Sequence, residues 1–181
     1  MLWMVNSFGR QGGGVTDLTL AERWALLEAT LRELKLAETP EALVDLVQPV
    51  ARAIAHADGI TIVKRIGEET DYLAEDTIEP LWTGLQFPID KCLAGRAMVE
   101  KQTILVADIT QVENIPLNVY LATFIRSLVA VPIGEPDPTY AICAYWKEAA
   151  PFDPETQALM EALAQAMGEA FARLADRGPA G

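Results

Sequence analysis

Cysteine and histidine are scarce in this sequence. The 181 residues include two cysteines, Cys92 and Cys143, and one histidine, His56. Two cysteines in a chain of this length do not make the disulfide framework that stabilises small secreted domains. We therefore expect a reducing compartment, and the cysteine usage favours the cytoplasm.

Basic residues and long hydrophobic runs are also few. Lys and Arg number 14 against 26 Asp and Glu, so the net charge is −12. Nucleic acid and anionic membrane surfaces are poor partners for such a chain, because both are bound through basic surface groups. No apolar run approaches the roughly 18 residues of a spanning helix. Residues 1–15 show neither a leading positive charge nor a cleavage site, so we predict no signal peptide and no membrane insertion.

The length and the balance of residues fit one globular domain. Hydrophobic residues make up 51% of the chain and charged residues 22%, which is typical of a protein with a substantial core. We expect a flexible N-terminal lead over residues 1–18, a single domain over 19–176 and a tail over 177–181.

Two helices are expected in the first third of the chain. Thr19 and Glu22 form a capping box, which predicts an N-terminal helix over residues 19–37. Its apolar residues recur at helical spacing: Leu20, Trp24, Leu27, Leu31 and Leu34. A second helix begins at the Thr39-Pro40-Glu41 sequence, with a capping hydroxyl, a proline at the first position and an acid in the first turn.

The last helix is the clearest element of the sequence. Asp153 is expected to cap it and Pro154 to occupy its first position, so that the helix spans residues 154–176. Its apolar residues again follow the helical period: Met160, Leu163, Met167, Ala170 and Leu174.

The middle of the chain has the period of strands. We expect six of them, at residues 60–65, 71–75, 85–89, 103–107, 127–133 and 140–146. The last two are almost continuously apolar, which predicts central strands covered on both faces. Asp90 is expected to cap a short helix that runs through Met98, and residues 115–123 to be irregular or weakly helical. Strands grouped between terminal helices indicate an α+β fold with one sheet.

Several segments then occur in an order that is typical of a known family. They are residues 87–97, 103–109, 125–133, 141–146 and 152–155. From Pro40 to about Leu174 the chain resembles a GAF domain. Its order of short motifs is similar to that of the N-terminal GAF domains of bacterial sensor histidine kinases: Ile115-Pro116, Tyr120, Thr123-Phe124, Ser127-Leu128 and Val131-Pro132-Ile133.

The resemblance implies a fold and a function. The fold would be a central antiparallel sheet of about six strands, with the N- and C-terminal helices on one face. A ligand cavity would lie on the other face, under the helix near Leu93 and under residues 115–123. The implied function is that of a non-catalytic sensory domain, the input module of a two-component sensor histidine kinase. A free methionine sulfoxide reductase and a dimerisation scaffold without ligand remain as alternatives, because the fold alone does not decide function.

Ten residues are candidates for lining the implied pocket. They are Trp82, Phe87, Cys92, Arg96, Met98, Asp108, Tyr120, Phe124, Arg126 and Tyr145. Aromatic residues suit an apolar pocket with a few polar groups, and they equally suit ordinary core filling. Arg96 and Arg126 either pair with an anionic ligand or hold surface loops through a carboxylate such as Asp108. If Asp90 is the cap, Cys92 lies at the second helical position, where a thiolate is favoured; a packed thiol is the preferred interpretation.

The cofactor remains unidentified at this point, but two groups are disfavoured. Some relatives attach a bilin to a cysteine just before the strand at Ser127, and residues 112–126 contain neither cysteine nor histidine. A covalent bilin at that position is therefore excluded. His56 ends the second helix, where the helix dipole favours it, so a histidine-ligated haem is disfavoured. We find no metal-ligand spacing and no nucleophile–base pair.

The terminal helices carry apolar residues beside their main seams. Leu26 and Leu36 add to the first helix, and Leu159 and Phe171 add to the last. Surface of this kind predicts a two-fold homodimer through the terminal helices. The alternative is a monomer in which these helices only cover the sheet.

Overall fold

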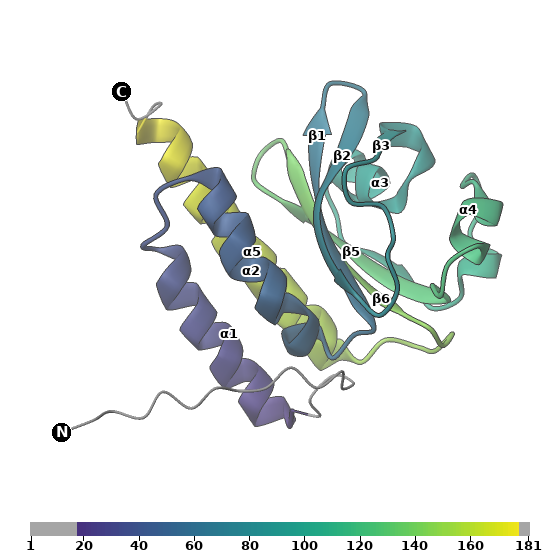
Figure 1. Ribbon diagram of the computed structural model, residues 1–181, viewed down its shortest axis with the longest axis horizontal. Helices are drawn as coiled ribbons and strands as arrows, with labels where there is room; N and C mark the ends of the chain where they lie inside the picture. Colours follow the sequence, from purple (N-terminus) through teal and green to yellow (C-terminus); the bar gives the residue numbers. More distant parts are fainter. Residues whose placement is uncertain (1–17, 178–181) are drawn as a thin grey trace.

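Six antiparallel strands form a single curled sheet with three long helices on one face (Figure 1). The computed structural model describes residues 18–177. The strands are β1 (Gly59–Ile66), β2 (Glu69–Thr77), β3 (Gln86–Pro88), β4 (Ile104–Val106), β5 (Ser127–Ile133) and β6 (Tyr140–Trp146). Their order across the sheet is β3-β2-β1-β6-β5-β4. The expected α+β fold class is confirmed, and β5 and β6 are interior strands with the predicted bounds.

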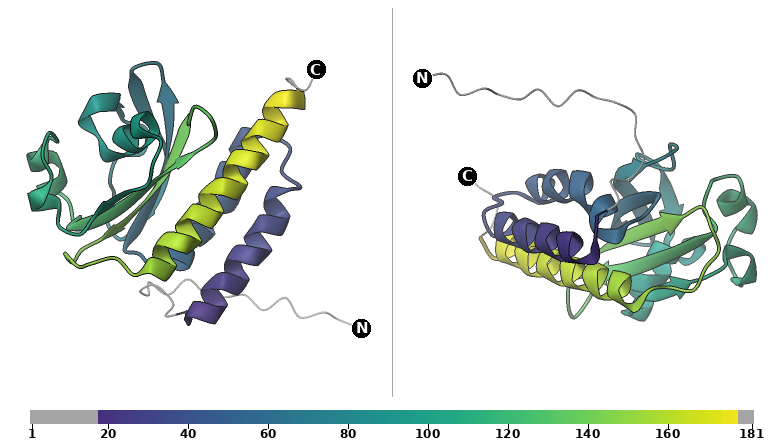
Figure 2. Two further views of the ribbon diagram at one scale, coloured as in Figure 1. Left: turned by 180° about the vertical axis from the view of Figure 1, so that it is seen from behind. Right: turned by 90° about the horizontal axis from the view of Figure 1, so that it is seen from below.

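The helical layer consists of α1 (Leu20–Leu34), α2 (Pro40–Ala55) and α5 (Pro154–Arg177). Helices α2 and α5 lie against the sheet, and α1 packs on them from the side away from the sheet (Figures 1 and 2). The capping box is present: the Thr19 hydroxyl accepts from the Glu22 amide at 3.3 Å, and the Glu22 carboxylate accepts from the Thr19 amide at 2.8 Å. Within residues 18–177, no helix is long and apolar enough to cross a membrane.

The ends of the terminal helices differ slightly from the prediction. Helix α1 stops at Leu34 rather than 37, because the chain turns there to place Ala37 in the core and to start α2 at Pro40. Arg177, expected in the tail, is the last residue of α5. Residues 1–17 of the predicted lead and 178–181 of the predicted tail lie outside the described residues, so the division into lead, domain and tail stays a prediction.

Side-chain alternation gives the sheet two different faces. In β6, Ile142 and Ala144 belong to the core under the helices, whereas Cys143 and Tyr145 belong to the core on the other face. Strand β2 carries a bulge at Leu73, since Ile62 pairs with Ala74 but Val63 pairs with Tyr72. Tyr72 and Ala74 therefore lie on opposite faces, although strict alternation would put them on the same face.

The face opposite the helical layer is covered by short elements. They are η1 (Ile89–Lys91), α3 (Leu93–Glu100), η2 (Ile109–Gln111) and α4 (Leu117–Leu121). Here the predicted cap was wrong. Asp90 lies in η1, and Cys92 is the N-cap of α3, with its sulfur accepting from the Gly95 amide at 3.3 Å. The chain doubles back so tightly here that a Cβ on Gly95 would overlap the Ile89 carbonyl oxygen. The helix therefore begins two residues later than the predicted cap at Asp90 would place it.

One buried cation joins the three long helices. Arg23 of α1 is 7% exposed. Its Nε donates to the Ile54 carbonyl of α2 at 2.8 Å, and its Nη2 donates to the Thr156 hydroxyl of α5 at 2.8 Å. Because hydrogen bonds to charged groups stabilise more than neutral ones, Arg23 is a principal polar anchor of α1.

We predict that Arg23→Ala lowers the free energy of unfolding by about 2 kcal/mol, because it removes two charge-assisted hydrogen bonds and leaves their acceptors buried. Urea denaturation followed by circular dichroism measures the change. Arg32→Ala on the exposed side of the same helix is the matched control and should change stability by less than about 0.5 kcal/mol. Equal losses in the two variants would contradict an anchoring role for Arg23.

Candidate functional site

Five aromatic rings form a cluster on the face opposite the helical layer. They are Tyr72, Trp82, Phe87, Tyr120 and Tyr145, and we call them the aromatic cluster. Trp82 lies at its centre, with ring centroids 5.4 Å from Tyr72, 5.9 Å from Phe87, 5.4 Å from Tyr120 and 6.2 Å from Tyr145, all edge to face. Such contacts stabilise more than the buried area alone. Four of the five rings were predicted from the sequence, and Tyr72 was missed because the bulge in β2 turns it to this face.

The cluster leaves almost no free space. The cavity beside Trp82, Phe87, Cys92 and Tyr120 has a volume of about 10 Å³, which is close to the minimum for one water molecule. The ligand cavity implied by the family resemblance is therefore filled by the protein's own side chains in this structure.

The three phenols of the cluster are neutral, and the hydroxyls of Tyr120 and Tyr145 are hydrogen-bonded. The Tyr145 hydroxyl lies 2.7 Å from the Thr61 hydroxyl, and the Tyr120 hydroxyl accepts from the Leu93 amide at 3.2 Å. Burial raises the pKa of Tyr72, Tyr120 and Tyr145 above the ordinary value for tyrosine. These phenols therefore stay protonated at neutral pH and offer no charge to a ligand.

The other apolar candidates pack around the same core. Cys92 and Met98 are buried beneath it, and Phe124 packs against it from the segment before β5. The Cys92 sulfur lies 3.4 Å from the Thr70 hydroxyl. Burial raises the pKa of Cys143 to about 12. Both cysteines are free and buried, so each thiol is placed as a structural group.

The charged candidates hold loops instead of lining the cavity. Arg96 donates to the Glu113 carbonyl at 2.9 Å, and Arg126 donates to the Thr123 and Ile125 carbonyls at 2.9 and 2.7 Å. The Asp108 carboxylate accepts from the amide and hydroxyl of Thr110 at 2.9 and 2.7 Å. None of the three lines the cavity. In this structure both arginines hold loops through backbone carbonyls and not through a carboxylate such as Asp108.

Glu75, which holds the connection between β2 and β3, was not predicted from the sequence. Residues 78–85, here called the Trp82 loop, connect β2 to β3 and carry the central ring of the cluster. The Glu75 carboxylate accepts from the amides of Leu81, Trp82 and Thr83 at 2.9, 2.9 and 3.0 Å. Burial raises the pKa of Glu75, but the three amide hydrogen bonds outweigh it and hold the pKa below its usual value. The charged carboxylate is therefore the form that fastens the loop.

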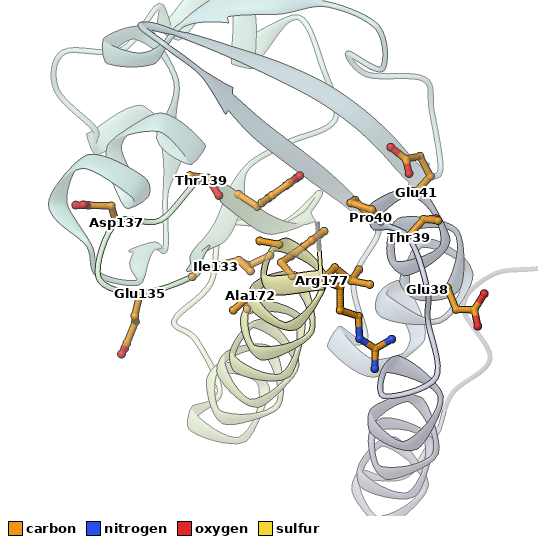
Figure 3. Close-up of a pocket in the computed structure, with 16 residues that line it drawn as sticks. Glu38, Thr39, Pro40, Glu41, Ile133, Glu135, Asp137, Thr139, Ala172 and Arg177 are labelled. Carbon is orange, nitrogen blue, oxygen red and sulfur yellow. The ribbon is translucent and has the colours of Figure 1, made fainter. Parts of the chain in front are cut away.

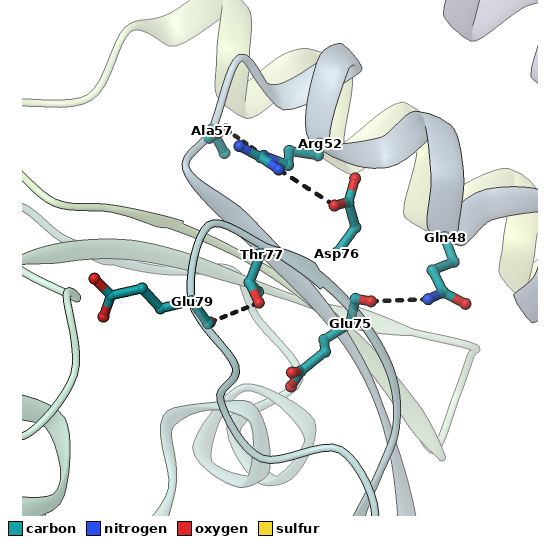
Figure 4. Close-up of polar contacts among 7 residues, drawn as sticks. All are labelled: Gln48, Arg52, Ala57, Glu75, Asp76, Thr77 and Glu79. Atoms are coloured by element: carbon teal, nitrogen blue, oxygen red, sulfur yellow. Dashed lines mark hydrogen bonds and ion pairs between the residues drawn. The ribbon is translucent and has the colours of Figure 1, made fainter. Parts of the chain in front are cut away.

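Figure 4 shows how Glu75 is oriented. Gln48 of α2 donates to the Glu75 backbone carbonyl at 2.8 Å, while the carboxylate points away from that helix. The neighbouring Asp76 instead pairs with Arg52 of α2 at 3.3 Å. Successive acidic residues of β2 thus serve opposite faces of the sheet.

The larger clefts lie elsewhere, along the C-terminal half of α5. One of about 850 Å³ is lined by Glu38, Glu41, Tyr140 and Phe171 among others, and Figure 3 shows it between the start of α2 and the end of α5. A second of about 680 Å³ flanks the other side of α5. Both share Gly134 and Gly168, where a Cβ on Gly168 would lie 3.0 Å from the Gly134 nitrogen. None of the ten candidates lines either cleft.

Metal-binding groups are not gathered in the part of the chain that the structure describes. No group of three or more His, Cys, Asp or Glu side chains there could hold a metal ion.

Fold and site together define an α+β domain with a helical layer on one face of the sheet and an aromatic cluster on the other. The model of the GAF domain family matches residues 37–172. The chain belongs to the GAF domain family, as its motifs predicted.

Solved structures of low sequence identity share this fold. The GAF domain of a phosphoenolpyruvate-protein phosphotransferase from Coxiella burnetii is 17% identical, with a TM-score of 0.75 over 90% of this chain and 100% of that one. The free methionine-R-sulfoxide reductase from Neisseria meningitidis, solved with its substrate, is 14% identical, with a TM-score of 0.76 over 91% and 97% of the two chains. The phycocyanobilin-bound GAF domain of a cyanobacterial phytochrome is 17% identical, with a TM-score of 0.71 over 91% and 100%. No curated protein matches the chain.

We predict that Glu75→Gln destabilises the protein most at neutral pH. A carboxyl group whose pKa is lowered by folding stabilises the folded state above its unfolded pKa of about 4.3 and loses that effect as the pH falls through its folded pKa. The difference in free energy of unfolding between wild type and variant should therefore shrink from pH 7 to pH 3. Urea titrations at these two pH values measure it, with Glu79→Gln in the exposed part of the same loop as the control. A difference that does not depend on pH would refute the contribution of the carboxylate.

Proposed function

We propose that this GAF domain is a non-catalytic sensory and regulatory module of bacterial signal transduction. It binds a small molecule at the aromatic cluster and transmits the binding event through α5 to an output domain. A two-component sensor histidine kinase is the output that the motif order favours, and the cytoplasm is the compartment that the cysteine usage favours. The observation that carries the proposal is the placement of two neighbouring residues of β6, Tyr145 and Trp146.

These residues link the aromatic cluster to the start of α5. Tyr145 is part of the cluster, and Trp146 emerges on the helical face. The Trp146 ring packs edge to face on Phe152 with centroids 5.4 Å apart, and its Nε1 donates to the His56 carbonyl at 2.9 Å. Phe152 stands two residues before the first residue of α5. A shift of β6 caused by ligand binding would therefore reach α5 through one ring contact, and helix shifts of an ångström or two are a common switching motion.

The thiols support a non-catalytic function. The name of the Neisseria meningitidis protein raises reduction of free methionine sulfoxide as an alternative. In this chain the Cys92 sulfur caps α3 and the Cys143 thiol is buried in a central strand. Reactive cysteines are instead accessible and have a lowered pKa.

We predict that binding of a small molecule changes α5 and that the change requires Trp146. Native mass spectrometry of freshly purified protein should show a bound small molecule. Its removal and re-addition should alter hydrogen exchange in the first turns of α5. Trp146→Leu should keep the binding and lose most of the response in α5, because it removes the contact with Phe152. Trp24→Leu, which removes a partly buried indole from α1, is the control that should keep both.

Two results would contradict the proposal. Binding without any change in the hydrogen exchange of α5 would separate the ligand from regulation. Thiol-dependent reduction of free methionine sulfoxide, lost in Cys92→Ser, would show that the domain is an enzyme.

The proposal includes a homodimer formed through the terminal helices, although fewer exposed apolar residues support it than the sequence indicated. Leu159 is fully buried within the chain, and Phe171 stacks on Tyr140 with centroids 4.1 Å apart. Leu159 is therefore not left for a partner, and Phe171 is partly covered by Tyr140. The exposed apolar side chains that remain at α1 are Leu20 at 42% and Leu36 at 72% exposure.

We predict a dimer mass by light scattering at micromolar concentration and a monomer mass for Leu36→Glu. The substitution places a charge at the proposed interface without disturbing the core, because Leu36 is mostly exposed. Lys35→Glu is the control, since it adds negative charge one residue away. A mass near 19.7 kDa for the wild type at every concentration would end the dimer proposal.

A further inference from the structure

We infer that the ligand takes the place of the Trp82 indole, that it enters when the Trp82 loop detaches from Glu75, and that it is a flat, uncharged aromatic molecule of about the size of indole. The inference rests on the proposed function and names the ligand class and the entry route of the same site. It follows from three features of the structure: the origin of the Trp82 ring, the way its loop is fastened, and the chemistry of the surrounding walls.

Trp82 differs from the other members of the cluster in the element that carries it. Tyr72, Phe87 and Tyr145 belong to strands and Tyr120 to a helix, whereas Trp82 is carried by a connecting loop. It is nevertheless 7% exposed and contacts the other four rings. Movement of this loop would empty an indole-sized volume whose walls are the four other rings.

The Glu75 side chain fastens residues 81–83 in the middle of the Trp82 loop, and the Thr77 hydroxyl donates to the Glu79 carbonyl at 2.7 Å nearer its start (Figure 4). At its ends, the Ile78 amide donates to the Asp58 carbonyl at 3.0 Å and the Gly84 amide donates to the Tyr72 carbonyl at 2.9 Å. Between these points the three amides of residues 81–83 donate to the Glu75 carboxylate. Gly84 has a φ of +80°, a conformation that glycine adopts at little cost and that suits a hinge at the end of the moving segment.

The walls of this volume are apolar and uncharged. Of the residues that line the small cavity, Lys91 alone carries a charge, and it lies at the exposed rim, paired with Asp90 at 2.9 Å. The Tyr120 and Tyr145 hydroxyls are engaged with Leu93 and Thr61. A charged ligand would lose its hydration against walls whose one charged group, Lys91, is already paired with Asp90, so a neutral ring is favoured. Edge-to-face contacts with four aromatic rings favour a flat aromatic ligand over an aliphatic one of equal size.

The fastening by Glu75 sets the apparent affinity. For a ligand that binds only when the loop is open, the apparent dissociation constant equals the intrinsic constant divided by the fraction of molecules whose loop is open. Weakening the Glu75 hydrogen bonds raises the open fraction, and so it must tighten binding even though Glu75 itself never touches the ligand. Glu75 is thus a positioning residue, and a purely structural role would predict weaker binding or none.

Indole is the probe for the experiment, and the full chain labelled with 5-fluorotryptophan is the reporter. The ¹⁹F resonance of Trp82 is assigned by its loss in Trp82→Phe. Saturating indole should move this resonance to the position of a solvent-exposed tryptophan. Glu75→Gln should bind indole about tenfold more tightly than the wild type, which is the effect of losing one charge-assisted hydrogen bond. Glu79→Gln makes the same charge change within the Trp82 loop, with its carboxylate pointing away from the Glu75 carboxylate, and should bind like the wild type (Figure 4).

Charged analogues complete the test. Tryptamine and indole-3-acetate should each bind at least about tenfold more weakly than indole, because each buries an unpaired charge. Three results would overturn the inference: no binding of indole to wild type and Glu75→Gln, binding that leaves the Trp82 resonance in place, or equal affinities in Glu75→Gln and Glu79→Gln. A co-purified ligand that changes α5 while the Trp82 resonance stays fixed would preserve the proposed function and reject this inference. Displacement of Trp82 without a response in α5 would do the reverse.

Discussion

The two-sided burial of β6 is the constraint on which the rest of the structure depends. A central strand with apolar side chains on both faces has to be covered twice, and its alternation assigns each residue to one of two cores. The aliphatic side chains of Ile142 and Ala144 pack directly under the helices. The larger ring of Tyr145 needs a deeper layer of side chains to bury it and a polar partner for its hydroxyl. The helical layer covers one face of this strand, and the aromatic cluster covers the other.

This arrangement separates stability from recognition. The long helices, joined by Arg23 and by the aliphatic core, cover the face that contains no candidate ligand group. The other face is covered by short helices and by a connecting loop whose middle is held by the Glu75 carboxylate. Elements with few backbone contacts open at lower free energy than the core of a domain. A ligand site built from them is able to change conformation without unfolding the sheet.

Local patterns predicted the regular elements well, and tertiary contacts explain what they missed. The bounds of β5 and β6 follow from unbroken apolar runs, and the start of α1 follows from its capping box. Both patterns are local, because they involve only residues that are close together in the sequence. The cap of α3 was misplaced because it depends on how closely the chain approaches itself at Gly95. Tyr72 was missed because a bulge reverses the face of a strand without a marker in the residue pattern. The partners of Arg96 and Arg126 are backbone carbonyls, which every residue carries, so no sequence pattern could identify them.

The contact between Gly134 and Gly168 joins the β5–β6 hairpin directly to the backbone of α5. The tip of the β5–β6 hairpin touches the helix backbone there, and a cleft lies on either side of that contact. Beyond Gly168 the helix is still held by the core through Ala170 and Leu174, and Arg173 donates to the Leu34 and Ala37 carbonyls at the end of α1. A displacement of the β5–β6 hairpin would therefore reach α5 through backbone atoms, which cannot rotate out of the way as a side chain can.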